Sequence, residues 1–134
     1  EELAVEVDAG RTGGVVDDSS AMRAFVRAAL EDDGIDDVSE ATSGFEALRI
    51  LPRETFDLVI VDVNMPDING LELVSFMRRS APHKTTPVII ISTEASAKEQ
   101  ERGIALGANA FLSKPFAASA LQALVRTMRE TTRS

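Results

Sequence analysis

The chain has 134 residues, of which 44% are hydrophobic and 27% charged, and its net charge is −8. These values are ordinary for one globular domain, and the acidic balance argues against a stand-alone nucleic-acid binder, because phosphate contacts need clustered Lys and Arg. No apolar run is long enough for a membrane span, and no signal peptide is visible. The lack of cysteine excludes disulfides and thiolate metal sites. We therefore expect a cytoplasmic protein.

The first third of the chain predicts a strand, a helix and a second, weaker strand. Residues 1–11 are expected to be a leader that is either disordered or not native to the protein, and one domain is expected over residues 12–131, with no second domain after it. The first strand ends at Val15-Val16, but Gly13-Gly14 predict that it is short or irregular. A helix with apolar residues at helical spacing then precedes Gly34, and a weak strand covers residues 38–41.

The rest of the chain continues the alternation of helices and strands. Two uninterrupted apolar runs, 58–61 and 88–91, predict strands that are buried on both faces, and 110–112 predicts a short fifth strand. Helices are expected after Ser43, from Asp67 or Asn69, over 95–106 and over 121–128. The helix over 95–106 has a poor apolar face and contains Gly103, at a cost of about 1 kcal/mol relative to Ala, so we expect it to be the least firmly held. Five alternations predict a doubly wound parallel α/β sheet.

Polar residues follow the ends of four of these strands. Asp17 and Asp18 end the first, Asp62 the third and Ser92 the fourth, and Lys114 follows the fifth. Because the carboxyl ends of parallel strands lie at one edge of a sheet, we expect these side chains to be neighbours. Each has an ordinary alternative when taken alone, namely a helix or loop cap, a hydroxyl bonded to backbone, or a solvated lysine. The combination of five is a specific signal.

This pattern resembles the receiver domain of two-component response regulators, most closely the single-domain CheY-like type. The resemblance covers roughly residues 12–130 and implies a flavodoxin/CheY-like fold, with five parallel strands in the order 2-1-3-4-5 and five helices. The matching motifs are Val15-Val16-Asp17-Asp18-Ser19, Val61-Asp62-Val63-Asn64-Met65-Pro66-Asp67, Asn69-Gly70, Ile91-Ser92-Thr93-Glu94-Ala95, Gly107-Ala108 and Lys114-Pro115-Phe116.

The resemblance implies a role for each site residue. Asp62 would accept a phosphoryl group from a phosphohistidine of a separate histidine kinase. Asp18, Asp62 and the backbone carbonyl of Asn64 would bind Mg²⁺ directly, and Asp17 would act mainly through water. Lys114, before a cis peptide bond to Pro115, would pair with Asp62 and then with a phosphoryl oxygen, and Ser92 would donate a hydrogen bond to another.

The resemblance also implies a switch, formed by Phe111, Thr93 and Glu94. Phe111 occupies a position where CheY-like proteins often have Tyr, so it could rotate inward but offers no hydroxyl. The output surface would be the face formed by residues 95–106, the strand 110–112 and the last helix, which would bind a downstream target protein, possible outputs being chemotaxis or motility. Asn64 and Glu94 flank the site and suggest a short-lived phosphoryl group. His83, in a loop that contains Pro and Lys, is expected to be solvated.

Three other interpretations account for part of this pattern. A haloacid-dehalogenase-like phosphotransferase also uses a strand-end Asp, but it needs an acid two positions later, where this chain has Asn64. A receiver-shaped scaffold that is never phosphorylated would lack an acid, the hydroxyl or the lysine. A DNA-binding regulator would need a further domain, and this chain would then be the receiver fragment of that longer protein. A phosphoacceptor switch that is not a conventional enzyme, and that contacts neither nucleic acid nor membrane, is the favoured interpretation.

Overall fold

One parallel sheet forms the centre of the molecule. The computed structural model describes residues 12–93 and 96–133, without the side chains of 129–133, so the expected leader lies outside the described residues. The strands are β1 (Thr12–Val16), β2 (Asp37–Ala41), β3 (Leu58–Asp62), β4 (Val88–Ser92) and β5 (Ala110–Ser113). They are all parallel and lie in the order β2-β1-β3-β4-β5, which confirms the predicted fold class.

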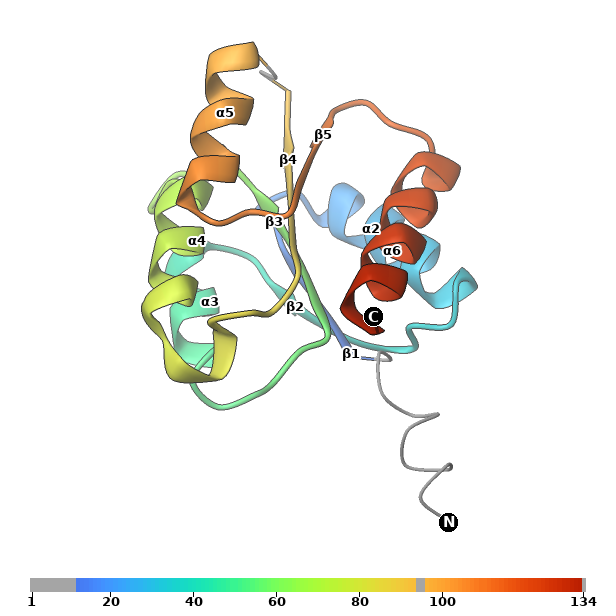
Figure 1. Ribbon diagram of the computed structural model, residues 1–134, viewed down its shortest axis with the longest axis horizontal. Coiled ribbons are helices and arrows are strands. Elements are labelled where there is room, and N and C mark those ends of the chain that lie inside the picture. Colours follow the sequence, from blue (N-terminus) through green and yellow to red (C-terminus); the bar gives the residue numbers. More distant parts are fainter. Residues whose placement is uncertain (1–11, 94–95, 134) are drawn as a thin grey trace.

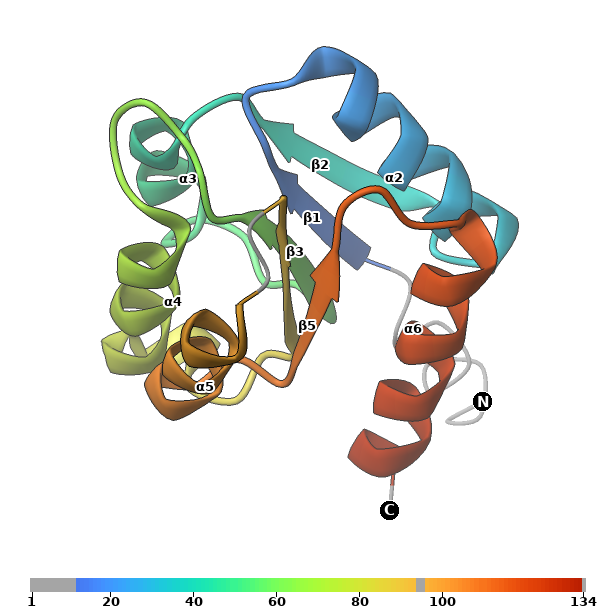
Figure 2. The same ribbon diagram turned by 90° about the horizontal axis from the view of Figure 1, so that it is seen from above.

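Helices cover both faces of the sheet. Helices α2 (Ser20–Asp32) and α6 (Ala118–Arg133) lie on one face, whereas α3 (Gly44–Ile50), α4 (Gly70–Arg79) and α5 (Ala97–Leu106) lie on the other (Figures 1 and 2). A short 3₁₀ helix, η1 (Ala81–His83), connects α4 to β4. Within the described residues, no helix combines the length and the apolar character that a membrane span requires.

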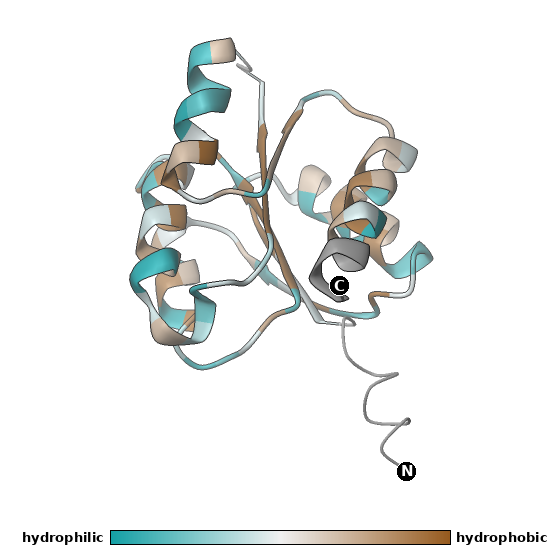
Figure 3. Cartoon of the chain, viewed as in Figure 1, coloured by the Kyte–Doolittle hydropathy of each residue, from teal (hydrophilic) through white to brown (hydrophobic). Residues whose placement is uncertain are grey.

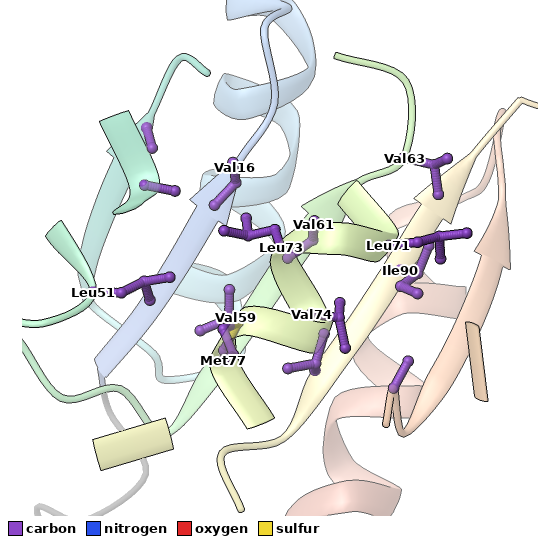
Figure 4. Close-up of a cluster of buried hydrophobic side chains, with 14 residues drawn as sticks. Val16, Leu51, Val59, Val61, Val63, Leu71, Leu73, Val74, Met77 and Ile90 are labelled. Carbon is purple, nitrogen blue, oxygen red and sulfur yellow. The ribbon is translucent and has the colours of Figure 1, made fainter. Parts of the chain in front are cut away.

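The alternation of side chains along each strand supplies two hydrophobic cores. In β3, Val59 and Val61 point to the core beneath α3 and α4, and Leu58 and Ile60 point to the core beneath α2 and α6. All four are at most 3% exposed, as expected for a strand buried on both faces. Figure 3 shows the hydrophobic residues concentrated on the strands, and Figure 4 shows the core under α3 and α4.

Helices α2, α3, α4 and α5 begin at side-chain caps. Ser43 and Asn69 accept hydrogen bonds from backbone N–H groups in the first turns of α3 and α4, as the sequence predicts. Helix α5 begins at Ala97 after the cap Ser96, two residues later than predicted. Gly103 is the only α5 residue that is fully buried, so α5 contributes little to the core.

Strand β1 is regular, which corrects the expectation based on its glycines. It pairs with β2 over all five residues and with β3 over four. Side chains from other segments pack against both glycines. A Cβ at Gly13 would lie 3.1 Å from Ile35 Cγ2, and one at Gly14 would lie 3.5 Å from the ring of Phe56.

We expect Gly14→Ala to raise the free energy of unfolding by about 0.5–1 kcal/mol, because it removes backbone entropy from the unfolded chain. The new methyl would meet Phe56 at an ordinary contact distance, beside a small cavity lined in part by Ala47 and Leu51. Urea unfolding measures the change. The matched control is Gly13→Ala, whose methyl is crowded by Ile35 and Leu30, so a stability ranking with Gly13→Ala above Gly14→Ala would contradict the prediction.

His83 is buried, so the prediction that it is solvated was wrong. Its side chain is fully enclosed, and its ring stacks on Phe56 with centroids 6.1 Å apart. Nε2 donates to the carbonyl of Leu51 at 2.6 Å, and Nδ1 therefore accepts from the hydroxyl of Thr86 at 3.2 Å. Leu51 and Phe56 lie in the connection between α3 and β3, more than 25 residues before His83, and the polar sequence around His83 gives no sign of them.

Arg78, near the end of α4, joins the segments at the amino-terminal edge of the sheet. Its Nε and Nη2 donate to the carbonyl of Gly107, the residue that ends α5, at 3.0 and 2.7 Å. Its Nη1 donates to the carbonyl of His83, and Nη2 also reaches Asn109 Oδ1. The carboxyl-terminal end of α5 is therefore fixed to α4.

Candidate acidic site at the strand ends

Three carboxylates meet where β1 and β3 end. The side chains of Asp17, Asp18 and Asp62 each place an oxygen within 4.8 Å of the others. Asp17 and Asp62 are buried, at 0% and 3% exposure, whereas Asp18 is exposed. The arrowheads of β2 and β5 in Figure 2 point to the same edge, where the loops after the strands gather. The predicted convergence of the acids is confirmed.

Lys114 supplies the positive charge next to the two buried acids. Its Nζ lies 3.1 Å from Asp17 Oδ2 and 3.1 Å from Asp62 Oδ1. The peptide bond between Lys114 and Pro115 is cis, as the sequence motif predicts. The Lys114 backbone N–H donates to the carbonyl of Ser92 at 2.8 Å, which holds the start of this loop against β4. The prediction that Lys114 pairs with Asp62 is confirmed, and Asp17 shares the same ammonium group.

The electrostatics of this cluster favour a bound cation. Burial raises the pKa of Asp62, the neighbouring charge of Asp17 raises it further, and Lys114 and a backbone hydrogen bond from Asn64 only partly oppose the rise. Burial works against the charge of Lys114, but the contacts with Asp62 and Asp17 outweigh it and raise the pKa of the ammonium group. Lys114 is therefore protonated at neutral pH, and one cation faces three acids.

This donor set suits Mg²⁺. A hard divalent ion prefers carboxylate oxygens together with water and phosphate oxygens, and the carboxylates here come from two rigid strand ends. Asp62 and Asp17 are held by the sheet, and the Asp17 carboxylate is oriented by the N–H of Ser19, at 2.9 Å from Oδ1. The structure therefore offers a site whose excess negative charge a magnesium ion would neutralise.

The remaining predicted residues lie around this cluster. Ser92 ends β4 next to β3 and is fully buried, and its hydroxyl donates to Glu99 Oε1 in α5 at 3.3 Å. Phe111 on β5 is half-buried against the core beneath α3 and α4. Asn64 and Thr93 are exposed. Glu94, the third predicted switch residue, lies outside the described residues.

The loop between β3 and α4 is attached to α3, which the sequence did not predict. Asp67 accepts hydrogen bonds from the backbone N–H groups of Gly44 and Phe45 at 3.1 and 2.9 Å, and its neighbour Ile68 packs on Gly44 so closely that a Cβ there would lie 2.7 Å away. Asp67 thus caps α3 from another segment and fixes the loop that contains Asn64. Only the position of an acid after Met65-Pro66 could have suggested this contact.

We expect Asp67 to stabilise the fold in a pH-dependent way. The N–H of Phe45, followed by those of Ile68 and Gly44, lowers the pKa of Asp67 to about 2. The stabilisation is therefore present above the unfolded value of 3.8 and is lost as the pH falls through 2. The free energies of unfolding of the wild type and Asp67→Asn should differ most well above pH 3.8, for example at pH 5, and the difference should shrink toward pH 2. A difference that is constant with pH, or that equals the one for Asp36→Asn at an exposed carboxylate, would contradict this.

Arg23 is a second residue that the sequence did not identify. From α2, its Nη1 donates to the backbone carbonyl of Asp17 at 2.7 Å, and its Nε pairs with Glu40 on β2 at 2.9 Å. Glu40 also pairs with Arg27, at 2.7 Å. This network fixes the end of β1 from the side of β2, and so fixes the backbone from which Asp17 and Asp18 project.

Comparison with known proteins agrees with the geometry. The family model for the response regulator receiver domain matches residues 14–126. A chemotaxis protein CheY homologue of Campylobacter jejuni is 39% identical over 109 residues, which cover 81% of this chain and 84% of that protein. CheY-3 of Vibrio cholerae is 36% identical over 108 residues, 81% of this chain and 83% of that protein.

A solved structure shows the same agreement in three dimensions. The chemotaxis response regulator CheY4 of Vibrio cholerae superposes with a TM-score of 0.81 at 36% identity, over 87% of this chain and 96% of that one. Sequence and fold therefore agree over the segment that contains the strand-end acids, Lys114 and Ser92. The chain belongs to the response regulator receiver domain family and is of the CheY-like type.

Proposed function

We propose that this chain is a phosphoacceptor switch in a two-component system, with Asp62 as the residue that is phosphorylated and residues 12–131 as the receiver domain. The proposal depends on one observation above all, namely that Asp62 is buried at a strand end within 3.1 Å of Lys114 and beside two further acids. The family relation to CheY proteins supports a role in chemotaxis or motility, a histidine kinase as phosphodonor, and action in the cytoplasm.

The chemistry assigned to Asp62 is a displacement at phosphorus. A carboxylate oxygen of Asp62 attacks the phosphoryl group of a phosphohistidine, a new O–P bond forms, and the N–P bond breaks with its electron pair left on the imidazole nitrogen. Lys114, protonated and at contact distance, stabilises the negative charge that accumulates on the transferred group. The hydroxyl of Ser92 then donates to a phosphoryl oxygen.

The metal in this proposal is Mg²⁺. Asp18, Asp62 and the carbonyl of Asn64 would hold it, with Asp17 acting mainly through water, and it would neutralise charge on the phosphoryl oxygens. Lys114 contacts both Asp17 and Asp62, so that the nucleophilic carboxylate is already oriented before the donor arrives. The product is an acyl phosphate, which the same site hydrolyses, so the chain resets itself and is not a conventional enzyme.

The test uses beryllofluoride, which mimics a phosphoryl group on a carboxylate, with Mg²⁺ and amide NMR. In the wild type we expect shifts at Ser92, Lys114 and Phe111 that saturate with the ligand. In Asp62→Asn these shifts should be absent. A wild type that fails to respond would identify a receiver-shaped scaffold, and an unchanged response in Asp62→Asn would place the acceptor elsewhere.

A further inference from the structure

The hydroxyl of Ser92 is engaged by a helix that the phosphoacceptor chemistry does not use. Ser92 Oγ donates to Glu99 Oε1 at 3.3 Å, from a fully buried position at the end of β4 to the first turn of α5. This separation is longer than most O–H···O hydrogen bonds, so the bond is weak enough to be exchanged for a better one. It connects β4, the neighbour of the Asp62 strand, to α5.

Glu99 is held within reach of Ser92 by the way α5 meets the sheet. Its backbone N–H donates to the cap Ser96 at 3.1 Å, which fixes the first turn. One turn further along, the buried Gly103 lets the helix lie directly on β4, because a Cβ there would be 2.9 Å from Ile90 Cδ1. The side chain of Glu99 is half-buried between these two points.

A serine hydroxyl has one proton and can donate it to one acceptor at a time. In the proposed function, Ser92 donates to a phosphoryl oxygen on Asp62, and the carboxylate of Glu99 competes for the same proton. We propose that Glu99 is a positioning residue that holds Ser92 in its unphosphorylated arrangement, so that phosphorylation breaks the Ser92–Glu99 bond and releases the first turn of α5 from β4. This inference rests on the proposed function and adds a residue that sets the balance of its two states.

Removal of the competing acceptor should favour the phosphorylated arrangement. We expect Glu99→Ala to bind beryllofluoride with Mg²⁺ about two- to threefold more tightly than the wild type, the change given by a hydrogen bond at the weak end of the usual range. Glu99→Gln retains a neutral acceptor oxygen, which forms a weaker bond than a carboxylate, so its affinity should lie between the two. Glu101→Ala removes the same charge from an exposed position on the same helix and should match the wild type.

The ligand-free proteins give a second measurement. The amide of Lys114 donates to the carbonyl of Ser92 and reports the position of that residue. In Glu99→Ala without ligand, the Ser92 and Lys114 resonances should move toward their positions in the beryllofluoride-bound wild type, whereas in Glu101→Ala they should not.

The outcomes separate the two proposals. If the wild type does not bind beryllofluoride, the proposed function is wrong and this inference is overturned with it. If the wild type binds through Asp62 but Glu99→Ala has the affinity of Glu101→Ala, the proposed function stands and the role of Glu99 is overturned. Tighter binding by Glu99→Ala, partly reversed in Glu99→Gln, supports both.

Discussion

Gly70→Ala is expected to lower the free energy of unfolding by about 4 kcal/mol or more. An added methyl should be more damaging here than at any of the glycines described above. The new Cβ would lie 2.2 Å from the backbone oxygen of Asp62 and 2.9 Å from Val63 Cα. These are backbone atoms, so no side-chain rotation relieves the overlap. Helix propensity alone predicts the opposite, because Ala is favoured over Gly in a helix by about 1 kcal/mol.

The overlap would also displace Asp62, the proposed phosphoacceptor. Gly70 begins α4, and its N–H donates to the carbonyl of Val63 at 2.9 Å, so the helix start and the end of β3 are in direct contact. Any movement that admits the methyl therefore shifts Asp62. Urea unfolding of Gly70→Ala and Gly14→Ala compares the same added methyl with and without a backbone overlap. A Gly70→Ala protein within 1 kcal/mol of the wild type would show that the two segments are less tightly joined than described.

Lys114→Met should destabilise the metal-free protein by about 3 kcal/mol, because it leaves two buried acids without their common counter-charge. Asp17 and Asp62 both contact the ammonium group at 3.1 Å. Burial and the charge of Asp17 already hold the pKa of Asp62 above its unfolded value of 3.8. The stability associated with Asp62 is therefore present below pH 3.8 and is lost as the pH rises through the higher folded value. The defect of Lys114→Met should accordingly be larger at neutral pH than below pH 3.8.

Two rescues distinguish a missing counter-charge from lost packing. Mg²⁺ should restore much of the stability of Lys114→Met in thermal unfolding, since a cation at the acids replaces the lost charge. Asp17→Asn in the same chain should also restore stability, by removing one of the two facing charges. Lys98→Met, at an exposed lysine of α5, is the control and should have little effect. Failure of both rescues would mean that Lys114 acts by packing alone.

The sequence predicted those parts of the site that depend on strand geometry. Asp17, Asp18 and Asp62 are far apart in the chain, but each follows a strand, and the carboxyl ends of parallel strands share an edge. This rule was sufficient to place the acids together and Lys114 beside them. It works because the backbone positions these residues, so that the details of side-chain packing do not matter.

The residues that the sequence missed are positioned by contacts between side chains and distant segments. His83 lies in a polar stretch but is enclosed by Phe56, Leu51 and Thr86. Asp67 caps a helix that begins 23 residues earlier. Local pattern contains no signal for either contact, because the partners are chosen by the packing of helices against the sheet. The same holds for Gly13 and Gly14, where side chains from other segments pack against β1.

Both ends of α5 are attached by hydrogen bonds, but phosphorylation would break the bond at only one end. At its carboxyl end, Arg78 makes two hydrogen bonds to the carbonyl of Gly107 that the phosphoryl chemistry does not reach. At its amino end, the Ser92–Glu99 bond is the one that a phosphoryl group would displace. With its carboxyl end fixed, α5 would rotate about Gly107. The displacement of its residues would therefore increase along about 15 Å of helix toward Ser96. A target that binds the first two turns of α5 would then distinguish the two states, whereas one that binds at the exposed Ile104, near the pivot, would not.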